Sequence, residues 1–322
     1  EQLFENIADH FGKPLTLESD PQLEDKALLA GGSGMLKDYN VNPLKAYFKW
    51  RLGVKVPAAV VLGVSPLERG NTLHEALETI WQALGGSAAL QDCTLAQIKQ
   101  LLEASTEESV DQVLARRFTP VSARLKQLEK QRLKNILLSW LAIESQRPAF
   151  VIDALEKPMV FTIGEPESAL NIQLRIDRID RLDDGQLLMI DYKSGNSFVA
   201  GWFDDNVTEP QLPLYACAVE DDEAVNSSKG LAIAYAKLKA GELAYDGITD
   251  DAGLAGDIKG ISSLEKRRNC ELEDWNSLLQ HWRSRFVEVA NEIISASAAI
   301  DITVSGIDDP IYEPAMRLNS AF

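Results

Sequence analysis

Residues 174–195 read LRIDRIDRLDDGQLLMIDYKSG, two apolar-rich stretches joined by Asp-Asp-Gly. The alternation of apolar and polar residues predicts two β-strands, and the joining residues predict a three-residue hairpin loop with glycine in the left-handed conformation. Leu182 would then pair with Gln186. Counting back along both strands, this register puts Asp177 opposite Asp191, whereas a two-residue loop would shift the pairing by one residue.

Two carboxylates that face each other across strands repel, so a cation is expected between Asp177 and Asp191. Mg²⁺ suits this position because it binds one or two carboxylates together with water and phosphate oxygens. Lys193 shares their face and could orient a water molecule or stabilise negative charge on a phosphate. We interpret these three residues as a metal site in preference to a surface ladder of ion pairs. Asp180 lies on the other face among arginines, and for it we favour the surface ladder.

The composition is typical of a soluble globular protein, with 45% hydrophobic and 25% charged residues among 322. No apolar run reaches membrane-spanning length, and the acidic N-terminus lacks the basic segment of a signal peptide. That start, which has no initiator Met, resembles a cut from a longer chain. Cys93, Cys217 and Cys270 lie far apart, which predicts neither a disulfide framework nor a zinc site and favours the cytoplasm.

The charge is distributed unevenly. A net charge of −17 argues against binding of nucleic acid by the whole surface, yet residues 116–134 carry seven Lys/Arg and one acidic residue. This basic strip is either a solvated helix face or a contact for a polyanion. The candidates for phosphate contacts within it are Arg116, Arg117, Arg124, Lys126, Arg132 and Lys134.

The pattern predicts an α/β domain with a mixed sheet. The flexible GGSG at 31–34 separates an acidic leader, 1–30, from a single domain, 31–322. Within that domain we expect a mainly helical part (31–150), a catalytic sheet core (151–240) and a C-terminal helical part (241–322). The predicted helices are 35–50 with a break at Asn42-Pro43, 66–84, 94–104, 107–146, 210–219 and 272–298. The predicted strands are 158–163, 170–182, 186–193 and 230–238.

Four segments in a fixed order resemble the PD-(D/E)XK nuclease superfamily. They are ERGNTLHEALETIW (68–81), similar to a G-x-x-x-H helix, RIDRID (175–180), DYKSG (191–195), and QLPLYACAV (211–219), similar to a Q-x-x-x-Y helix. The resemblance spans about residues 31–322 and is closest to RecB-like nucleases, in particular the C-terminal nuclease domain of AddB-type bacterial repair proteins. It implies a restriction-endonuclease-like core, a central mixed β-sheet flanked by helices, with a large helical insertion or N-terminal part.

The resemblance also implies roles for individual residues. It makes His74, Asp177, Asp191 and the carbonyl of Tyr192 ligands of Mg²⁺ or Mn²⁺, and it makes Lys193 the catalytic lysine. Gln211 and Tyr215 would line the active site. Relatives of the AddB type hold an iron–sulfur cluster through four cysteines; here Asn42 stands at the first of these positions and the C-terminal tail has no cysteine, so no cluster is expected.

Several of these residues have a second interpretation. His74 alone would be an ordinary histidine at the edge of the core, and Tyr215 fits the core equally well. Gln211 completes a capping box with Thr208, an alternative that we weigh evenly with an active-site role. For Glu68, a favourable charge in a first helical turn is preferred to a contact near the metal.

The implied function is metal-dependent hydrolysis of DNA, as an exonuclease in DNA repair or recombination. The sequence has no Walker A motif, so we expect a helicase region in a longer protein, or a helicase subunit, to supply the motor. The alternative is a catalytically silent, nuclease-like module that guides DNA or serves as a scaffold. An acidic interaction domain with an accidental motif match is disfavoured by the order of the four motifs.

Overall fold

A computed structural model describes residues 28–29, 31–54, 63–164, 169–220, 230–249, 257–261 and 274–295. The predicted leader before Leu28, Cys270 and the C-terminal tail lie outside these residues. Among the helices that the structure describes, none has the length and apolar character needed to cross a membrane.

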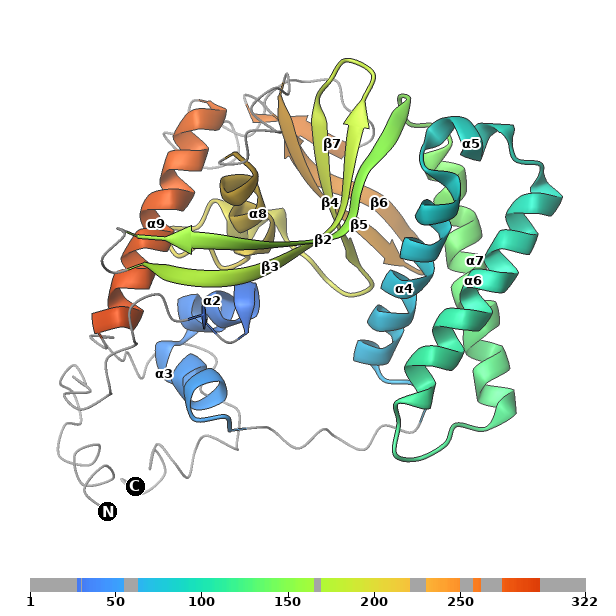
Figure 1. Cartoon of the computed structure of the whole chain (residues 1–322), viewed down its shortest axis with the longest axis horizontal. Coiled ribbons are helices and arrows are strands. Elements are labelled where there is room, and N and C mark those ends of the chain that lie inside the picture. The colour runs from blue at the N-terminus through green and yellow to red at the C-terminus, as the bar shows by residue number, and fades with distance from the viewer. Residues whose placement is uncertain are drawn as a thin grey trace.

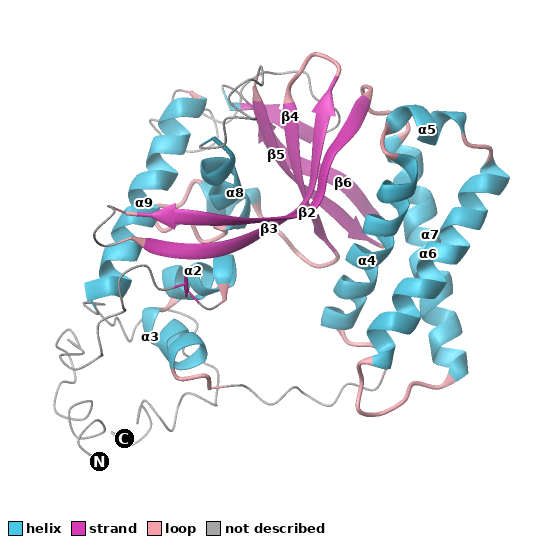
Figure 2. Ribbon diagram, in the orientation of Figure 1, coloured by secondary structure: helices cyan, strands magenta, loops and turns pink. Residues whose placement is uncertain are grey.

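The described residues form one mixed sheet of seven strands, with helices on both sides (Figure 2). The strand order is β1-β3-β4-β5-β6-β7, and β2 pairs with β3. The strands are β1 (Leu28–Leu29), β2 (Phe150–Ile163), β3 (Leu170–Leu182), β4 (Leu187–Lys193), β5 (Leu231–Lys239), β6 (Glu242–Thr249) and β7 (Asp257–Gly260). β1–β3, β4–β5 and β6–β7 are parallel pairs and the other pairs are antiparallel, which confirms the predicted mixed α/β architecture.

The helices divide between the two faces of the sheet (Figure 1). They are α2 (Gly32–Val41), α3 (Pro43–Ala46), α4 (Pro66–Leu84), α5 (Ser87–Asp92), α6 (Leu95–Ala115), α7 (Ala123–Glu144), α8 (Gln211–Glu220) and α9 (Trp275–Ser295), with a π-helical turn at Tyr47–Arg51 and a 3₁₀ turn at Val199–Trp202. Helices α4–α7 lie on one side, whereas α2, α8 and α9 lie on the other. The break predicted at Asn42-Pro43 is confirmed, because α2 ends before Asn42.

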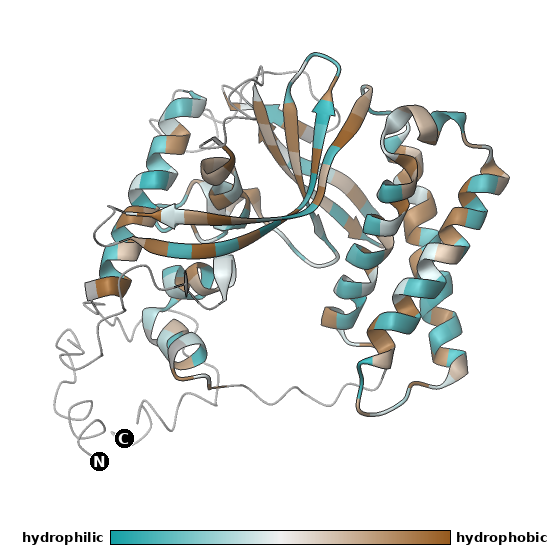
Figure 3. Ribbon diagram, viewed as in Figure 1, coloured by the Kyte–Doolittle hydropathy of each residue, from teal (hydrophilic) through white to brown (hydrophobic). Residues whose placement is uncertain are grey.

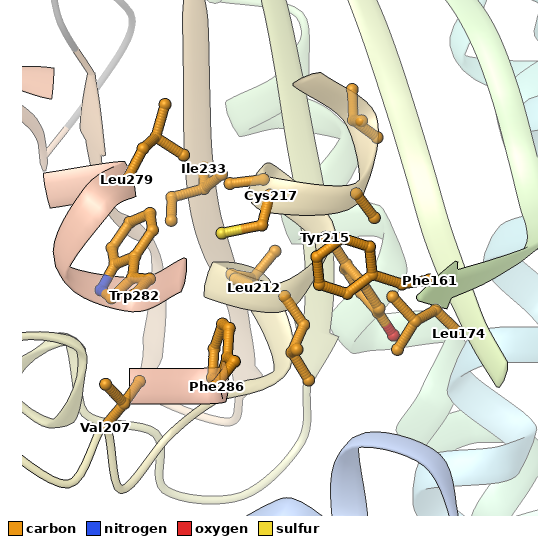
Figure 4. Close-up of a cluster of buried hydrophobic side chains, with 14 of the residues drawn as sticks. Phe161, Leu174, Val207, Leu212, Tyr215, Cys217, Ile233, Leu279, Trp282 and Phe286 are labelled. Carbon is orange, nitrogen blue, oxygen red and sulfur yellow. The ribbon is translucent and has the colours of Figure 1, made fainter. Parts of the chain in front are cut away.

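Each face of the sheet has its own hydrophobic core. Leu187 and Met189 of β4 belong to the core under α2, α8 and α9, and the alternate residues Leu188 and Ile190 belong to the core under α4–α7. Because both faces are buried, the strand reads as a continuous apolar run (Figure 3). Figure 4 shows the first core, where Trp282 of α9 packs beside α8 and its indole N–H donates to the Trp202 carbonyl at 2.8 Å.

Several sequence predictions of secondary structure are wrong. The predicted boundary between helices 94–104 and 107–146 is absent, because α6 runs unbroken from Leu95 to Ala115. The helix predicted over 107–146 is two helices, because Pro120 interrupts the chain and Ser122 caps the start of α7 by accepting a hydrogen bond from Leu125 N–H. α5 was not predicted. The segment 241–322 is not purely helical, since β6 and β7 extend the sheet beyond residue 240.

Asp180 is not a surface residue, which corrects the ladder interpretation. Its side chain is fully buried, as is that of Arg178, whose guanidinium donates to both Asp180 oxygens at 2.5 and 2.8 Å. Arg178 also donates to Glu144 of α7 and, at 3.1 Å, to the hydroxyl of Tyr192. Its guanidinium carbon lies 3.9 Å from the ring centroid of Trp81 of α4.

Arg147 and Tyr245 complete this buried ion cluster, which we define as Glu144, Arg147, Arg178 and Asp180 with Tyr192 and Tyr245. Arg147 lies 2.7 Å from Glu144 and 2.8 Å from Asp180, and the Tyr245 hydroxyl donates to Glu144. Two carboxylates and two guanidinium groups compensate each other's charge. Burial would raise the pKa of Glu144, but the charges of Arg178 and Arg147 outweigh it and lower that pKa.

Removing one partner of the cluster is expected to be costly. Arg178→Met leaves two buried carboxylates under-compensated and should lower the free energy of unfolding by about 3–5 kcal/mol, measured by urea denaturation. The control is Arg181→Met on the same strand, where the lost pair with Asp153 is solvent-exposed and should contribute less than about 1 kcal/mol. A loss below about 1 kcal/mol in Arg178→Met would contradict a structural role for the cluster.

The cluster also predicts a dependence of stability on pH. Because the folded pKa of Glu144 is lowered, its contribution is present above the unfolded pKa and is lost as pH falls through the folded value. The stability difference between the wild type and Glu144→Gln should therefore be largest near neutral pH and shrink in acid. Urea denaturation of both proteins at a series of pH values measures this; a constant difference would refute it.

Candidate metal centre and active site

The predicted hairpin register is confirmed as far as Arg178. The Leu182 N–H donates to the Gln186 carbonyl at 2.9 Å, Gly185 has φ 89°, and the ladder runs from Arg181–Leu187 to Arg178–Ile190. Asp177 and Asp191 lie one residue beyond the last of these pairs, where β3 and β4 separate. The two carboxylates are therefore placed at the opening between the strands.

The edge of β3 beyond Arg178 faces a cleft. On this edge β4 pairs only with residues 178–181 and β1 only with 171–172. The cleft has a volume of about 1270 Å³, and β3 contributes Gln173, Arg175 and Asp177 to its lining. The Tyr215 hydroxyl of α8 donates to the carbonyl of Arg175 at 2.6 Å, so a side chain takes the bond that a strand would otherwise provide.

Three groups from separate elements meet beside this edge. His74 of α4 has its Nδ1 3.3 Å from Asp177 Oδ2 of β3 and its Nε2 3.0 Å from the carbonyl oxygen of Tyr192 of β4. The N–H of Tyr192 donates to the same Asp177 oxygen at 2.9 Å. The structure thus brings together three of the four groups that the sequence singled out as metal ligands.

Glu156 is a third acidic or imidazole side chain at this point, and it was not predicted from the sequence. One ligand atom each from His74, Glu156 and Asp177 lies within 4.8 Å of the others. Glu156 sits on β2 with φ 43°, a strained conformation for a residue other than glycine, and its Oε2 lies 2.9 Å from Arg175 Nε. It precedes the predicted strand 158–163, so alternation could not assign it to a face.

Asp191 is fully buried and is not a member of this close set. Its Oδ2 is 2.6 Å from Lys193 Nζ, but neither oxygen accepts a hydrogen bond of good geometry from the described residues. Lys193 donates to Gln211 Oε1 at 2.9 Å, and Gln211 Nε2 donates to the Tyr215 hydroxyl at 3.0 Å. A chain of contacts therefore leads from Asp191 through the lysine to α8 and on to the backbone of β3.

Two alternative interpretations are settled by these contacts. The capping box at α8 is wrong, because the helix begins at Gln211 itself and the Thr208 hydroxyl donates to Asp204. At α4, Glu68 lies in the first helical turn, as the charge interpretation predicted, and it also accepts hydrogen bonds from Ser65 in a capping box that was not predicted. Tyr215 is both a core residue and a polar one, since its ring packs near Phe161 and Leu174 while its hydroxyl is hydrogen-bonded (Figure 4).

The electrostatics of the site reflect crowded carboxylates. Burial raises the pKa of Asp191 to about 6. The positive charge of Lys193 opposes this increase, whereas the negative charge of Asp177 adds to it. Burial and Asp177 also raise the pKa of Glu156. For His74, burial acts downward, but the hydrogen bond and charge of Asp177 prevail and raise the pKa to about 9. Such a site attracts a cation.

The predicted phosphate contacts lie on and beside the helical hairpin α6–α7. Most of them form ion pairs within the protein. Lys126 pairs with Asp111, Lys134 with Glu103, Arg132 with Glu129, Arg117 with Glu68 and Arg116 with Glu75, while Arg124 is exposed and has no ion pair within the described part of the chain. Arg116 is the member of this set that lines the cleft.

Comparison with known proteins agrees with this architecture. The model of the PD-(D/E)XK nuclease superfamily matches residues 34–302, and the chain belongs to that family. The mixed sheet flanked by helices is consistent with the restriction-endonuclease-like fold of the family. Nuclease chemistry, the hydrolysis of phosphodiester bonds, is therefore the activity that the family implies.

The remaining comparisons add little. The solved structure titled "Crystal structure of SSO0001" is similar over 97% of this chain and 94% of that chain, at 9% sequence identity and a TM-score of 0.29, a score too low to carry an argument. A search of curated proteins found no significant match.

The loop of the hairpin tests how strictly register governs the site. Deleting Asp184 should shift β4 by one residue and turn Asp191 and Lys193 to the opposite face. Mn²⁺ affinity, measured by isothermal titration calorimetry, should then fall at least tenfold, as for loss of a ligand or its support. Asp184→Asn is the control, because its side chain can still accept from Gln186 N–H. Unchanged Mn²⁺ affinity in the deletion would refute the dependence on register.

Proposed function

We propose that this chain is a metal-dependent DNA nuclease that hydrolyses phosphodiester bonds as an exonuclease. The observation that supports it best is the convergence of His74, Asp177 and the Tyr192 carbonyl at one end of a cleft, with the Asp191–Lys193 pair beside them. Membership of the superfamily supplies the reaction class. The proposal adds that the substrate is DNA and that hydrolysis proceeds from a DNA end.

The residues present fit a hard divalent cation. Carboxylate oxygens, a carbonyl oxygen and an imidazole nitrogen form a donor set compatible with Mg²⁺ or Mn²⁺, and the fully buried Asp191 has oxygens without hydrogen bonds of good geometry. We propose His74, Asp177, Asp191 and the Tyr192 carbonyl as ligands, with Glu156 as an additional one. A bound ion would polarise the scissile phosphate and lower the pKa of a water molecule.

Lys193 is suited to act as a cationic donor. The negative charge of Asp191 outweighs burial and raises the pKa of Lys193, so the side chain is an ammonium group at neutral pH. It therefore has protons to donate to phosphate oxygens and is not a general base. Placed against developing negative charge, such a preorganised donor stabilises the transition state.

Gln211 and Tyr215 position this lysine. The amide of Gln211 accepts from Lys193 and donates to Tyr215, which is anchored to the backbone of β3. Both side chains come from α8, whose other face is buried in the core. The lysine is thus fixed relative to the proposed ligands by a helix and not by a loop.

The finer assignment rests on the order of the sequence motifs. We propose a RecB-like or AddB-like nuclease domain that acts in DNA repair or recombination, without an iron–sulfur cluster, in the cytoplasm. We also propose a helicase domain or subunit as a partner. Support for a separate source of DNA affinity comes from the pairing of most strip cations with acidic residues of the same chain.

The assay is degradation of end-labelled linear DNA with Mg²⁺ or Mn²⁺. Asp191→Ala and Lys193→Ala should each reduce the rate by on the order of 10²-fold or more, the scale of losing one preorganised group. The matched control is Lys237→Ala, because Lys237 is the neighbour of Lys193 on β5 but pairs with Asp246. A closed circular substrate that resists attack would support the exonuclease.

Metal binding separates the possible outcomes. Asp177→Asn should weaken Mn²⁺ binding in calorimetry, whereas Lys193→Ala should retain it, since the lysine is not a ligand. Wild-type rates in both Asp191→Ala and Lys193→Ala would refute the assignment of the site. Metal binding with no cleavage by the wild type on single-stranded or duplex DNA would instead support the silent scaffold.

A further inference from the structure

The connection between α6 and α7, residues 116–122, is fastened to the helix that carries His74. Arg117 donates to the Gly63 carbonyl at 2.9 Å and lies 3.3 Å from Glu68, and Arg116 lies 2.9 Å from Glu75. Two arginines thus bind acidic residues about two turns apart in the N-terminal half of α4. Figure 1 shows this connection beside that end of α4. The tip of the helical hairpin is therefore held at a fixed position relative to the candidate active site.

This fixed tip presents an aromatic ring to solvent. Phe118 follows Arg117 directly and is fully exposed, at 107%. Leu67, beside the Glu68 that holds Arg117, is 74% exposed. Single exposed apolar residues are common, but Phe118 is an aromatic side chain on an anchored loop.

The tip is continuous with the cleft of the candidate site. Leu67 and Arg116 both line that cleft, together with His74 and Lys193. Arg124, in the first turn of α7, is exposed and forms no ion pair among the described residues. A polyanion that leaves the cleft on this side would meet arginine and an exposed ring together, the combination that binds unpaired nucleic acid.

We propose that the α6–α7 tip is a contact for a single-stranded DNA segment that leaves the cleft, with Phe118 stacked on a base and Arg116 and Arg124 beside the phosphates. The inference rests on the proposed function, because it takes DNA as the substrate. Stacking needs only the π-face of a base, so this contact tolerates any sequence but requires an unpaired nucleotide. The proposed contact therefore gives this rim of the cleft a preference for single-stranded DNA.

The test compares binding of a fluorescent oligo-dT with that of an abasic oligomer of the same length and charge. Anisotropy is measured with EDTA, so hydrolysis is not required and failure of the nuclease proposal leaves the result interpretable. Phe118→Ala should bind oligo-dT on the order of tenfold more weakly, the scale of base–aromatic stacking, and the abasic oligomer nearly as the wild type does. Phe118→Trp should retain affinity.

Two further variants distinguish stacking from other effects. Leu95→Ala removes a similarly exposed apolar residue at the far end of α6, roughly 30 Å away by helical rise, and should change neither affinity. Arg124→Ala, which removes a proposed phosphate contact without an anchor of the tip, should weaken both oligomers equally. If Phe118→Ala binds oligo-dT as Leu95→Ala does, the ring belongs to another contact, such as a protein partner, and the proposal is overturned. An equal loss on both oligomers would likewise refute stacking.

Discussion

The rest of the site depends on the interactions of the buried Arg178. Its guanidinium joins α7, β3 and β4 through Glu144, Asp180 and the Tyr192 hydroxyl. Asp177 precedes it directly in the chain, so this cation fixes the strand at the residue after the carboxylate that meets His74. On neighbouring β4, Tyr192 turns its ring to the cluster on the same face of the sheet while its backbone carbonyl meets the histidine. Charge compensation in the core and geometry in the cleft are thus coupled through adjacent residues.

This cluster is better explained by the specific strand register that it enforces than by a contribution to stability. Apolar residues of similar volume can match or exceed the stability of a buried ion pair, so the net contribution of such a cluster is modest even though removing one partner is costly. What the cluster provides is a single register. A slip of β3 by one residue would turn Asp177 toward the cluster and Arg178 toward the opposite face, which leaves both carboxylates of the cluster without this partner.

The sequence predicted those parts of the site that local rules determine. Loop length and alternation sufficed for the hairpin register as far as Arg178, next to Asp177, and helical spacing sufficed for α4, because both depend on residues close in the chain. Burial of Asp180 could not be predicted, since its partner Arg147 comes from a loop after α7. Glu156 was missed because its direction depends on an irregular backbone, φ 43°, that no local pattern indicates. The break between α6 and α7 could have been predicted from Pro120 and Ser122.

The contrast between contacts within a segment and contacts between distant segments also explains how an acidic chain presents a site for a polyanion. The lysines that made residues 116–134 look like a binding strip mostly pair with α6, so their charge stabilises the helical hairpin. Arg116 and Arg117 instead bind α4 and hold the tip of that hairpin beside the cleft. Positive charge on this protein therefore acts first to position an element, and only under the proposed function do Arg116 at the rim and Lys193 inside also receive phosphate. Electrostatic attraction over the whole surface is unfavourable, which leaves recognition to the cleft and its rim.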